Sequence, residues 1–345
     1  MTEAERERDG ATPEHDAVPW WGTRGASVRY GRHFALDHVS FRAAGGRVSA
    51  VVGGDGAGKS TLLRCLAGAL APSGGEVRRP DPRRIGYLAP GSGCYPDLTV
   101  EENLAFRAAA YRVAPAVARQ RAAEYLERTG LAAARHRLAG RLSGGMRQKL
   151  GVIAAMLHEP SLLVLEEPTT GVDPVSRADL WWLIARAAAA VPSGESWGAR
   201  SVVPPGVSCG GSWGARSVVP PGGTAVVVST TYLDEAQRAA WVLVLDSGRE
   251  IAAGTPAEIA ASVPGTIRAT SLRPAGEEGR RAWRRGGGWR VWDPESEDPG
   301  GERDTAGAAV PGDPAGTCRI QPDLQDAVTV AELARELGLT GGDVR

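Results

Sequence analysis

Residues 48–70 read VSAVVGGDGAGKSTLLRCLAGAL, and this stretch decides the fold. Residues 48–52 form a short apolar run typical of a buried strand, and the segment from Lys59 onward has helical periodicity. The turn between them fits G-x-x-x-x-G-K-[ST], in which backbone N–H groups turn inward around a β-phosphate. The stretch therefore predicts a strand, a phosphate-binding loop, and a helix whose positive N-terminal end faces the phosphates.

The loop also predicts a nucleotide and a metal ion. The Lys59 ammonium is expected to reach the β- and γ-phosphates, and the Ser60 hydroxyl to ligate Mg²⁺. Lysine occurs only at positions 59 and 149, so arginine replaces it everywhere except at the motif position and one other. The predicted cofactors are ATP and Mg²⁺. The residues expected to bind ATP in this loop are Gly53, Gly54, Asp55, Gly56, Ala57, Gly58, Lys59, Ser60 and Thr61.

Two later segments indicate how the nucleotide is used. LLVLEEP (162–168) ends a buried strand with two carboxylates, where ligands sit in open α/β sheets. We expect Glu166 to hold the hydration shell of Mg²⁺ and Glu167 to orient the attacking water. LSGGMRQKL (142–150) begins a helix whose free N–H groups suit a γ-phosphate. If this helical segment projects outward, it serves the ATP of another chain, which implies a dimer.

Composition limits the classes of protein. The chain has 345 residues, of which 42% are hydrophobic, and a formal net charge of +0, so we expect no nucleic-acid partner. No apolar run approaches the ~18 residues that span a bilayer, and the N-terminus is charged and polar, unlike a signal peptide. Four cysteines without metal-ligand spacing favour a reduced, cytoplasmic setting.

Strands and helices alternate along the chain, which predicts a mainly parallel sheet covered by helices. We expect a disordered tail over 1–25, an ATP-binding domain over 26–263 with a helical subdomain at about 91–145, and a C-terminal extension over 264–345, largely disordered at 278–316. SWGARSVVPPG occurs twice, at 196–206 and 212–222. This insertion, about 191–223, is either a partner-binding arm or a disordered loop from a local duplication.

Together these segments closely resemble the ATP-binding subunit of an ABC transporter over about residues 26–263. GGDGAGKST is similar to the Walker A motif, LSGGMRQ to the signature motif, and LLVLEEP to the Walker B motif. TTGVDPVSR (169–177) resembles the D-loop, with Asp173, and STTYLDEA (229–236) the switch region. GCYPDLTVEENL and PDLQDAV (322–328) are similar to the drug- and lipid-export subfamily of ABC-2-type transporters. By this resemblance the residues that contact the partner's ATP are Leu142, Ser143, Gly144, Gly145 and Met146.

The resemblance implies a P-loop NTPase fold of the α/β class: a mainly parallel sheet core, an inserted helical subdomain and an antiparallel N-terminal β part. It also implies membrane permease subunits and a second ATP-binding subunit as partners, at the cytoplasmic face of the membrane. A groove near residues 91–100 is expected to receive a cytoplasmic helix of the permease. Tyr30 is expected to stack on adenine, although an aromatic residue there also serves simple packing.

Three positions depart from the family pattern. Glu166 stands where Asp is usual, Pro90 (or Ala89) where a Gln contacts Mg²⁺, and Thr231 where a His contacts the γ-phosphate. These changes predict intact ATP binding with weakened hydrolysis, either slow turnover or near-zero activity in a homodimer. Two alternatives to an energising transport subunit stay open: a hydrolysis-poor regulatory subunit of a heterodimer, and a soluble, non-transport ABC ATPase.

Overall fold

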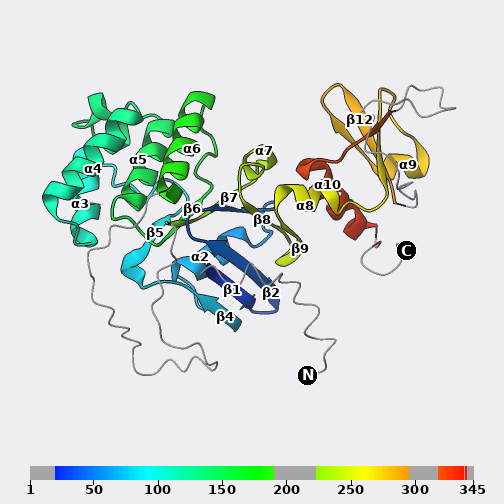
Figure 1. Ribbon diagram of the computed structural model, residues 1–345, viewed down its shortest axis with the longest axis horizontal. Helices are drawn as coiled ribbons and strands as arrows, with labels where there is room; N and C mark the ends of the chain where they lie inside the picture. The colour runs from blue at the N-terminus through cyan, green and yellow to red at the C-terminus, as the bar shows by residue number, and fades with distance from the viewer. Residues whose placement is uncertain (1–19, 190–222, 295–317, 338, 340–345) are drawn as a thin grey trace.

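The computed structural model describes residues 20–189, 223–294, 318–337 and 339. Its strands form three sheets (Figure 1). The largest has six strands in the order β5-β6-β7-β3-β8-β9, of which all but the last pairing are parallel. The expected mainly parallel core is therefore confirmed. In sheet order the strands are β5 (Ile85–Leu88), β6 (Leu162–Glu166), β7 (Ala225–Thr230), β3 (Val48–Val52), β8 (Trp241–Asp246) and β9 (Arg249–Gly254).

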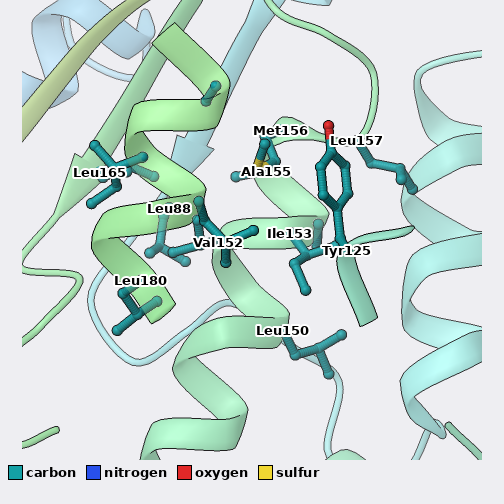
Figure 2. Close-up of a cluster of buried hydrophobic side chains, with 14 of the residues drawn as sticks. Leu88, Tyr125, Leu150, Val152, Ile153, Ala155, Met156, Leu157, Leu165 and Leu180 are labelled. Atoms are coloured by element: carbon teal, nitrogen blue, oxygen red, sulfur yellow. The ribbon is translucent and has the colours of Figure 1, made fainter. Parts of the chain in front are cut away.

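Successive residues of the central strands face opposite sides of this sheet. In β6, Leu163 and Leu165 enter one apolar cluster and Leu162 and Val164 the other. The first cluster lies under α5 (Gly144–Met156) and α6 (Pro174–Ala189), and Figure 2 shows the α5 side chains packed against Tyr125 and strand residues. The second lies under α2 (Lys59–Ala67) and the N-terminal sheet. Both faces of the strands are buried, which explains their unbroken apolar sequences.

The N-terminal sheet is antiparallel, with the strand order β2-β1-β4. Its strands are β1 (Trp20–Tyr30), β2 (His33–Ala44) and β4 (Gly74–Arg78). The expectation of disorder up to residue 25 is wrong from Trp20 onward, because Trp20 and Trp21 pair with the end of β2 and are buried. The guanidinium carbons of Arg42 and Arg78 lie over the Trp20 ring, at 4.9 and 5.2 Å from its centroid. Residues 1–19 lie outside the described part.

Residues 100–128 form α3 (Val100–Ala110) and α4 (Pro115–Arg128) on the side of α5 away from the central sheet (Figure 1). A capping box starts α3: the Thr99 hydroxyl accepts from the Glu102 N–H, and the Glu102 carboxylate accepts from the Thr99 N–H. Pro115 opens α4, where a missing N–H is harmless. The buried Lys149 ammonium joins α5 to α6 through Asp179 Oδ2 at 2.5 Å.

The C-terminal extension forms a third sheet, in the order β11-β12-β10-β13. The expectation of disorder for 278–294 is wrong, because Arg285 and Arg290 of the hairpin bind the fully buried Asp326. Two other segments predicted to be disordered lie outside the described residues. They are residues 295–316 and, apart from residue 223, the repeat insertion at about 191–223. The elements are α8 (Pro256–Ala261), β10 (Thr266–Thr270), α9 (Gly276–Arg280), β11 (Ala282–Arg285), β12 (Gly288–Asp293), β13 (Cys318–Ile320) and α10 (Leu324–Glu336).

Helix α10 joins this extension to the ATP-binding part. Leu324 and Val328 pack with Ile259 of α8 and with the central strands β3 and β8. The same cluster contains Ala236 of α7 (Leu233–Ala236), the short helix that follows β7. On the other side, Val330 packs against Trp292 of the third sheet.

Candidate functional site

The phosphate loop lies between β3 and α2 and holds a conformation that glycine permits. Gly58, the residue before α2, has φ 106°, in the left-handed region. At Gly53, a Cβ atom would lie 2.2 Å from the carbonyl oxygen of Leu245, so the backbone of β8 leaves no room for a side chain. The loop is thus shaped by its neighbours as well as by its own sequence.

Lys59 places its ammonium group inside this loop. Nζ donates to the carbonyl oxygens of Gly53 at 2.7 Å and Gly54 at 2.9 Å, and the residue is buried. The same nitrogen lies 3.9 Å from Glu167 Oε1. The structure therefore brings the predicted phosphate-binding cation and the predicted catalytic carboxylate to one place.

The two carboxylates of LLVLEEP have different surroundings. Glu166 ends β6 and is only 2% exposed, whereas the Glu167 side chain is 32% exposed. Glu167 has φ 46°, and its N–H donates to Ser229 Oγ at 3.1 Å. This bond ties the turn after β6 to the neighbouring strand β7. Glu167 Oε2 accepts a hydrogen bond from the Thr170 hydroxyl at 3.2 Å.

Sequence reasoning missed Tyr87 as a member of this site. Its hydroxyl, on β5, donates to Glu166 Oε2 at 2.8 Å. Burial, followed by this contact with Glu166, raises the pKa of Tyr87 to about 12, so the phenol stays protonated. Among the described residues, Glu166 Oε1 is a buried carboxylate oxygen with no hydrogen-bond partner. The tyrosine in IGYL lies 79 residues from Glu166, and nothing local in the sequence links them.

The switch region contains a second group that the sequence analysis missed. Thr231, at the predicted histidine position, is exposed after β7. Glu235 is 1% exposed, and its Oε2 accepts from the hydroxyls of Thr169 at 2.7 Å and Thr230 at 2.9 Å. Arg177 Nε, at the start of α6, lies 3.6 Å from the other oxygen. Glu235 thus joins the segment after Glu167 to the switch region. The sequence signals it only as an acidic residue within STTYLDEA, because its burial is visible in the structure alone.

The signature segment lies apart from the loop of its own chain. Ser143 caps α5, with Oγ accepting from the Met146 N–H at 3.2 Å, and Ser143 and Gly144 are exposed. A Cβ atom at Gly145 would lie 2.8 Å from Ser176 Oγ and 3.1 Å from Asp173 Oδ2, so this segment lies against the start of α6. In the described structure, no polar contact of residues 142–146 reaches residues 53–61.

The remaining predicted positions lie around the loop. Tyr30 ends β1 and is 53% exposed. It pairs with His33, two residues before Ala35, and the carbonyl oxygen of Ala35 lies against Gly58. Pro90 follows β5, is exposed, and has no side-chain donor or acceptor. Asp173 accepts a hydrogen bond from the Ser176 N–H at 2.9 Å, and this contact lowers the pKa of its carboxyl group.

No helix of the described residues is long and apolar enough to cross a membrane. Within that same part of the chain, no group of three or more His, Cys, Asp or Glu side chains has the arrangement of a metal site.

Comparison with known proteins agrees with this geometry. Residues 36–170 match the family model described as ABC transporter. The chain is 36% identical over 266 residues to the daunorubicin resistance ATP-binding protein DrrA3 of Streptomyces coeruleorubidus, covering 74% of each chain. It is 36% identical over 230 residues to the probable multidrug ABC transporter ATP-binding protein YbhF of Escherichia coli, covering 64% of this chain but only 34% of YbhF.

A solved structure described as the ATP-binding subunit of an ABC transporter has the same fold. The match has a TM-score of 0.57 at 24% identity and covers 70% of this chain and 92% of that one. This agreement confirms the expected P-loop NTPase fold. From the matched family model, the relatives and the arrangement of loop and carboxylates, the chain belongs to the family of ABC transporter ATP-binding proteins.

Proposed function

We propose that this chain binds and hydrolyses ATP to drive export of a small amphiphilic or drug-like substrate through separate membrane permease subunits. The observation that carries the proposal is the Lys59 ammonium inside the glycine loop, 3.9 Å from Glu167 Oε1. A phosphate-binding cation and a carboxylate able to orient water are what phosphoryl transfer to water requires. The relatives named for daunorubicin resistance and multidrug transport support the substrate class.

ATP binds along the loop between β3 and α2. The N–H groups of the loop wrap the β-phosphate, the N-terminus of α2 favours the negative charge, and Lys59 exchanges its carbonyl contacts for phosphate oxygens. The contacting residues are Gly53, Gly54, Asp55, Gly56, Ala57, Gly58, Lys59, Ser60 and Thr61. Tyr30, exposed at the end of β1, stacks on the adenine ring.

The residues around the γ-phosphate position also fit a magnesium ion. The buried Glu166 Oε1 has no hydrogen-bond partner in the described structure, so it is available to a water molecule on a metal ion. Ser60, the second residue of α2, supplies the hydroxyl ligand expected in this motif. Mg²⁺, when bound, neutralises charge on the phosphate oxygens. Glu166 then accepts from its hydration shell and orients those waters.

Glu167 is the residue that orients the attacking water. Its left-handed backbone turns the side chain out of the strand, and the bond from its N–H to Ser229 holds that turn. The carboxylate accepts the water's hydrogen bond and polarises it as it approaches the γ-phosphate. Thr231 offers a hydroxyl near the end of β7 but no positive charge.

ATP is enclosed between two ATP-binding chains. The signature residues 142–146 include an exposed helix N-terminus at Ser143 and Gly144, which is suited to the γ-phosphate bound by a partner chain. Asp173, which is exposed beside the signature segment, faces the same interface. The partner is a second copy or a related ATP-binding chain, and closure of the pair moves the permease subunits.

The helical part offers a surface for the permease. Tyr95 and Phe106 are 50% and 48% exposed, and their rings meet edge to face at 5.0 Å between centroids. Exposed aromatic side chains of this kind are enriched at protein interfaces. Tyr95 lies within residues 91–100, where a cytoplasmic permease helix docks, and Phe106 packs against it, so the chain works peripherally at the cytoplasmic face of the membrane.

A regulatory, hydrolysis-poor subunit is the second candidate function. It is favoured by the absence of a ligating side chain at Pro90 and of a cationic side chain at Thr231. In a heterodimer, the signature segment of such a chain completes the ATP site of a partner that hydrolyses efficiently.

ATP turnover by purified wild-type protein, beside Glu167→Gln, tests the proposal, with dimerisation followed in ATP and Mg²⁺. The proposal expects slow turnover in the wild type, loss of turnover in the variant, and an ATP-trapped dimer of the variant. ATP binding without turnover in either protein would favour the regulatory subunit. Absence of ATP binding would overturn both functions.

A further inference from the structure

Tyr87 and Glu166 lie on the same face of the central sheet. Tyr87 is opposite Val164 in the parallel pairing of β5 with β6, and Glu166 follows Val164 by two residues. Since alternate residues of a strand share a face, the phenol points along the sheet toward the carboxylate that ends β6. The resulting bond, 2.8 Å from the Tyr87 hydroxyl to Glu166 Oε2, lies near the α2 side of the sheet, where Tyr87 packs with the apolar cluster.

The bond depends on the length of the glutamate side chain. An aspartate at position 166 would withdraw its carboxylate by about one C–C bond, or ~1.5 Å. That displacement would stretch the contact beyond hydrogen-bond range unless the backbone moved. The contact between Tyr87 and position 166 therefore requires the longer glutamate side chain.

The two oxygens of Glu166 are consequently in different states. Oε2 is occupied by the phenol, whereas Oε1 is buried without a hydrogen-bond partner in the described structure. A buried carboxylate oxygen that lacks a donor is costly, so its position indicates a ligand that supplies one. Without the phenol, rotation about the terminal bond of the side chain would place either oxygen in the unpaired position.

We propose that Tyr87 is a positioning residue, which holds Glu166 Oε2 so that Oε1 alone faces a water molecule of the Mg²⁺ bound with ATP. This inference rests on the proposed role of Glu166 toward Mg²⁺. A donor on the adjacent strand accounts for where the Glu166 carboxylate lies. Tyr87 itself contacts neither the nucleotide nor the metal.

The test is the Mg²⁺ dependence of ATP binding by the full chain, measured by calorimetry or with a fluorescent ATP analogue, in EDTA and across a Mg²⁺ titration. Tyr87→Phe should weaken the apparent Mg²⁺ affinity of the ATP complex roughly threefold to tenfold, the range for the net contribution of a typical hydrogen bond. ATP affinity in EDTA should change less than about twofold, since the phenol does not reach the phosphates.

Two comparisons separate positioning from a general structural effect. In a Glu166→Asp background, Tyr87→Phe should have no further effect, because the shorter carboxylate no longer reaches the phenol. Tyr111→Phe is the matched control: its hydroxyl also binds β5, donating to the carbonyl oxygen of Ile85 at 3.2 Å, but it does not touch Glu166. The control should retain the wild-type Mg²⁺ dependence.

The possible failures are distinguishable. Unchanged Mg²⁺ affinity in Tyr87→Phe, or an equal loss in the Glu166→Asp background or in Tyr111→Phe, would overturn the positioning role. If Glu166→Gln weakens Mg²⁺ binding and Tyr87→Phe does not, only this inference fails. If Glu166→Gln also has no effect, the proposed role of Glu166 fails as well.

Discussion

Glu235 is the buried group whose removal should perturb the protein most clearly. Its Oε2 accepts from two hydroxyls, of Thr169 at 2.7 Å and Thr230 at 2.9 Å, which lie on the segments that follow β6 and end β7. Both threonines and Glu235 are at most 1% exposed, so the hydroxyls lose their acceptor inside the protein. Glu235→Ala should therefore loosen the carboxyl ends of two neighbouring strands.

The magnitude follows from these contacts. A buried hydroxyl that loses its acceptor costs about 1–3 kcal/mol, and two are affected. Arg177 Nε, 3.6 Å from Oε1, is buried and has no hydrogen-bond partner in the described structure, so the truncation also leaves this group without its carboxylate. The truncation also leaves a cavity. We expect Glu235→Ala to lower the free energy of unfolding by about 3–5 kcal/mol. Glu235→Gln keeps one oxygen for both hydroxyls and should cost about 1 kcal/mol.

Urea unfolding followed by circular dichroism measures these differences, and ATP turnover measures their consequence for the site. Because Thr169 follows Glu167 by two residues, kcat should fall more than KM rises in Glu235→Gln. Asp234→Ala is the matched control, since it removes an exposed carboxylate from the same short helix. If Glu235→Ala unfolds within about 1 kcal/mol of the wild type, the hydroxyl contacts do not stabilise the fold as argued.

Three further predictions concern other elements. Gly53→Ala should lower the stability of the nucleotide-free protein by about 2 kcal/mol or more, because its Cβ would lie 2.2 Å from Leu245 O; thermal unfolding measures the change. Burial lowers the pKa of His158 to about 4 from 6.5. Between these pH values the unfolded state therefore binds more protons than the folded state. The free energy of unfolding should fall by about 2–3 kcal/mol on acidification through that window. His158→Phe should remove that pH dependence from denaturation curves. Lys149→Met breaks the 2.5 Å contact with Asp179 and should cost about 2 kcal/mol in urea unfolding, since the aspartate, 32% exposed, remains partly hydrated.

Each of these predictions has a comparison within the chain. A Cβ atom at Gly54 meets nothing within 4 Å, so Gly54→Ala should leave nucleotide-free stability unchanged. The His136 side chain is 77% exposed, and its replacement by Phe should leave the acid slope in place. Arg186→Ala removes an exposed pair with Glu124, at 3.9 Å, and should cost less than about 1 kcal/mol. Equal effects in a variant and its control would contradict the corresponding explanation.

The prediction of a disordered segment at 278–294 failed because its stabilising partner is distant in the sequence. The stretch is rich in Gly and Arg, a composition usual for solvated loops. Its hairpin is held by Arg285 and Arg290 on Asp326, 41 and 36 residues away, and by Trp292 packed against Val330. Local composition contains no information on such contacts.

The sequence alone determined the phosphate loop, the apolar strands and the two carboxylates, because glycine spacing, periodicity and adjacent charges are properties of short segments. Only the tertiary structure decided what surrounds those carboxylates. The strand order β5-β6-β7 places Tyr87 beside Glu166, and the end of β7 with the short helix α7 places Thr230 and Glu235 beside Thr169. In a parallel sheet, neighbouring strands are separated in sequence by whole helices, so these contacts form only when the sheet assembles.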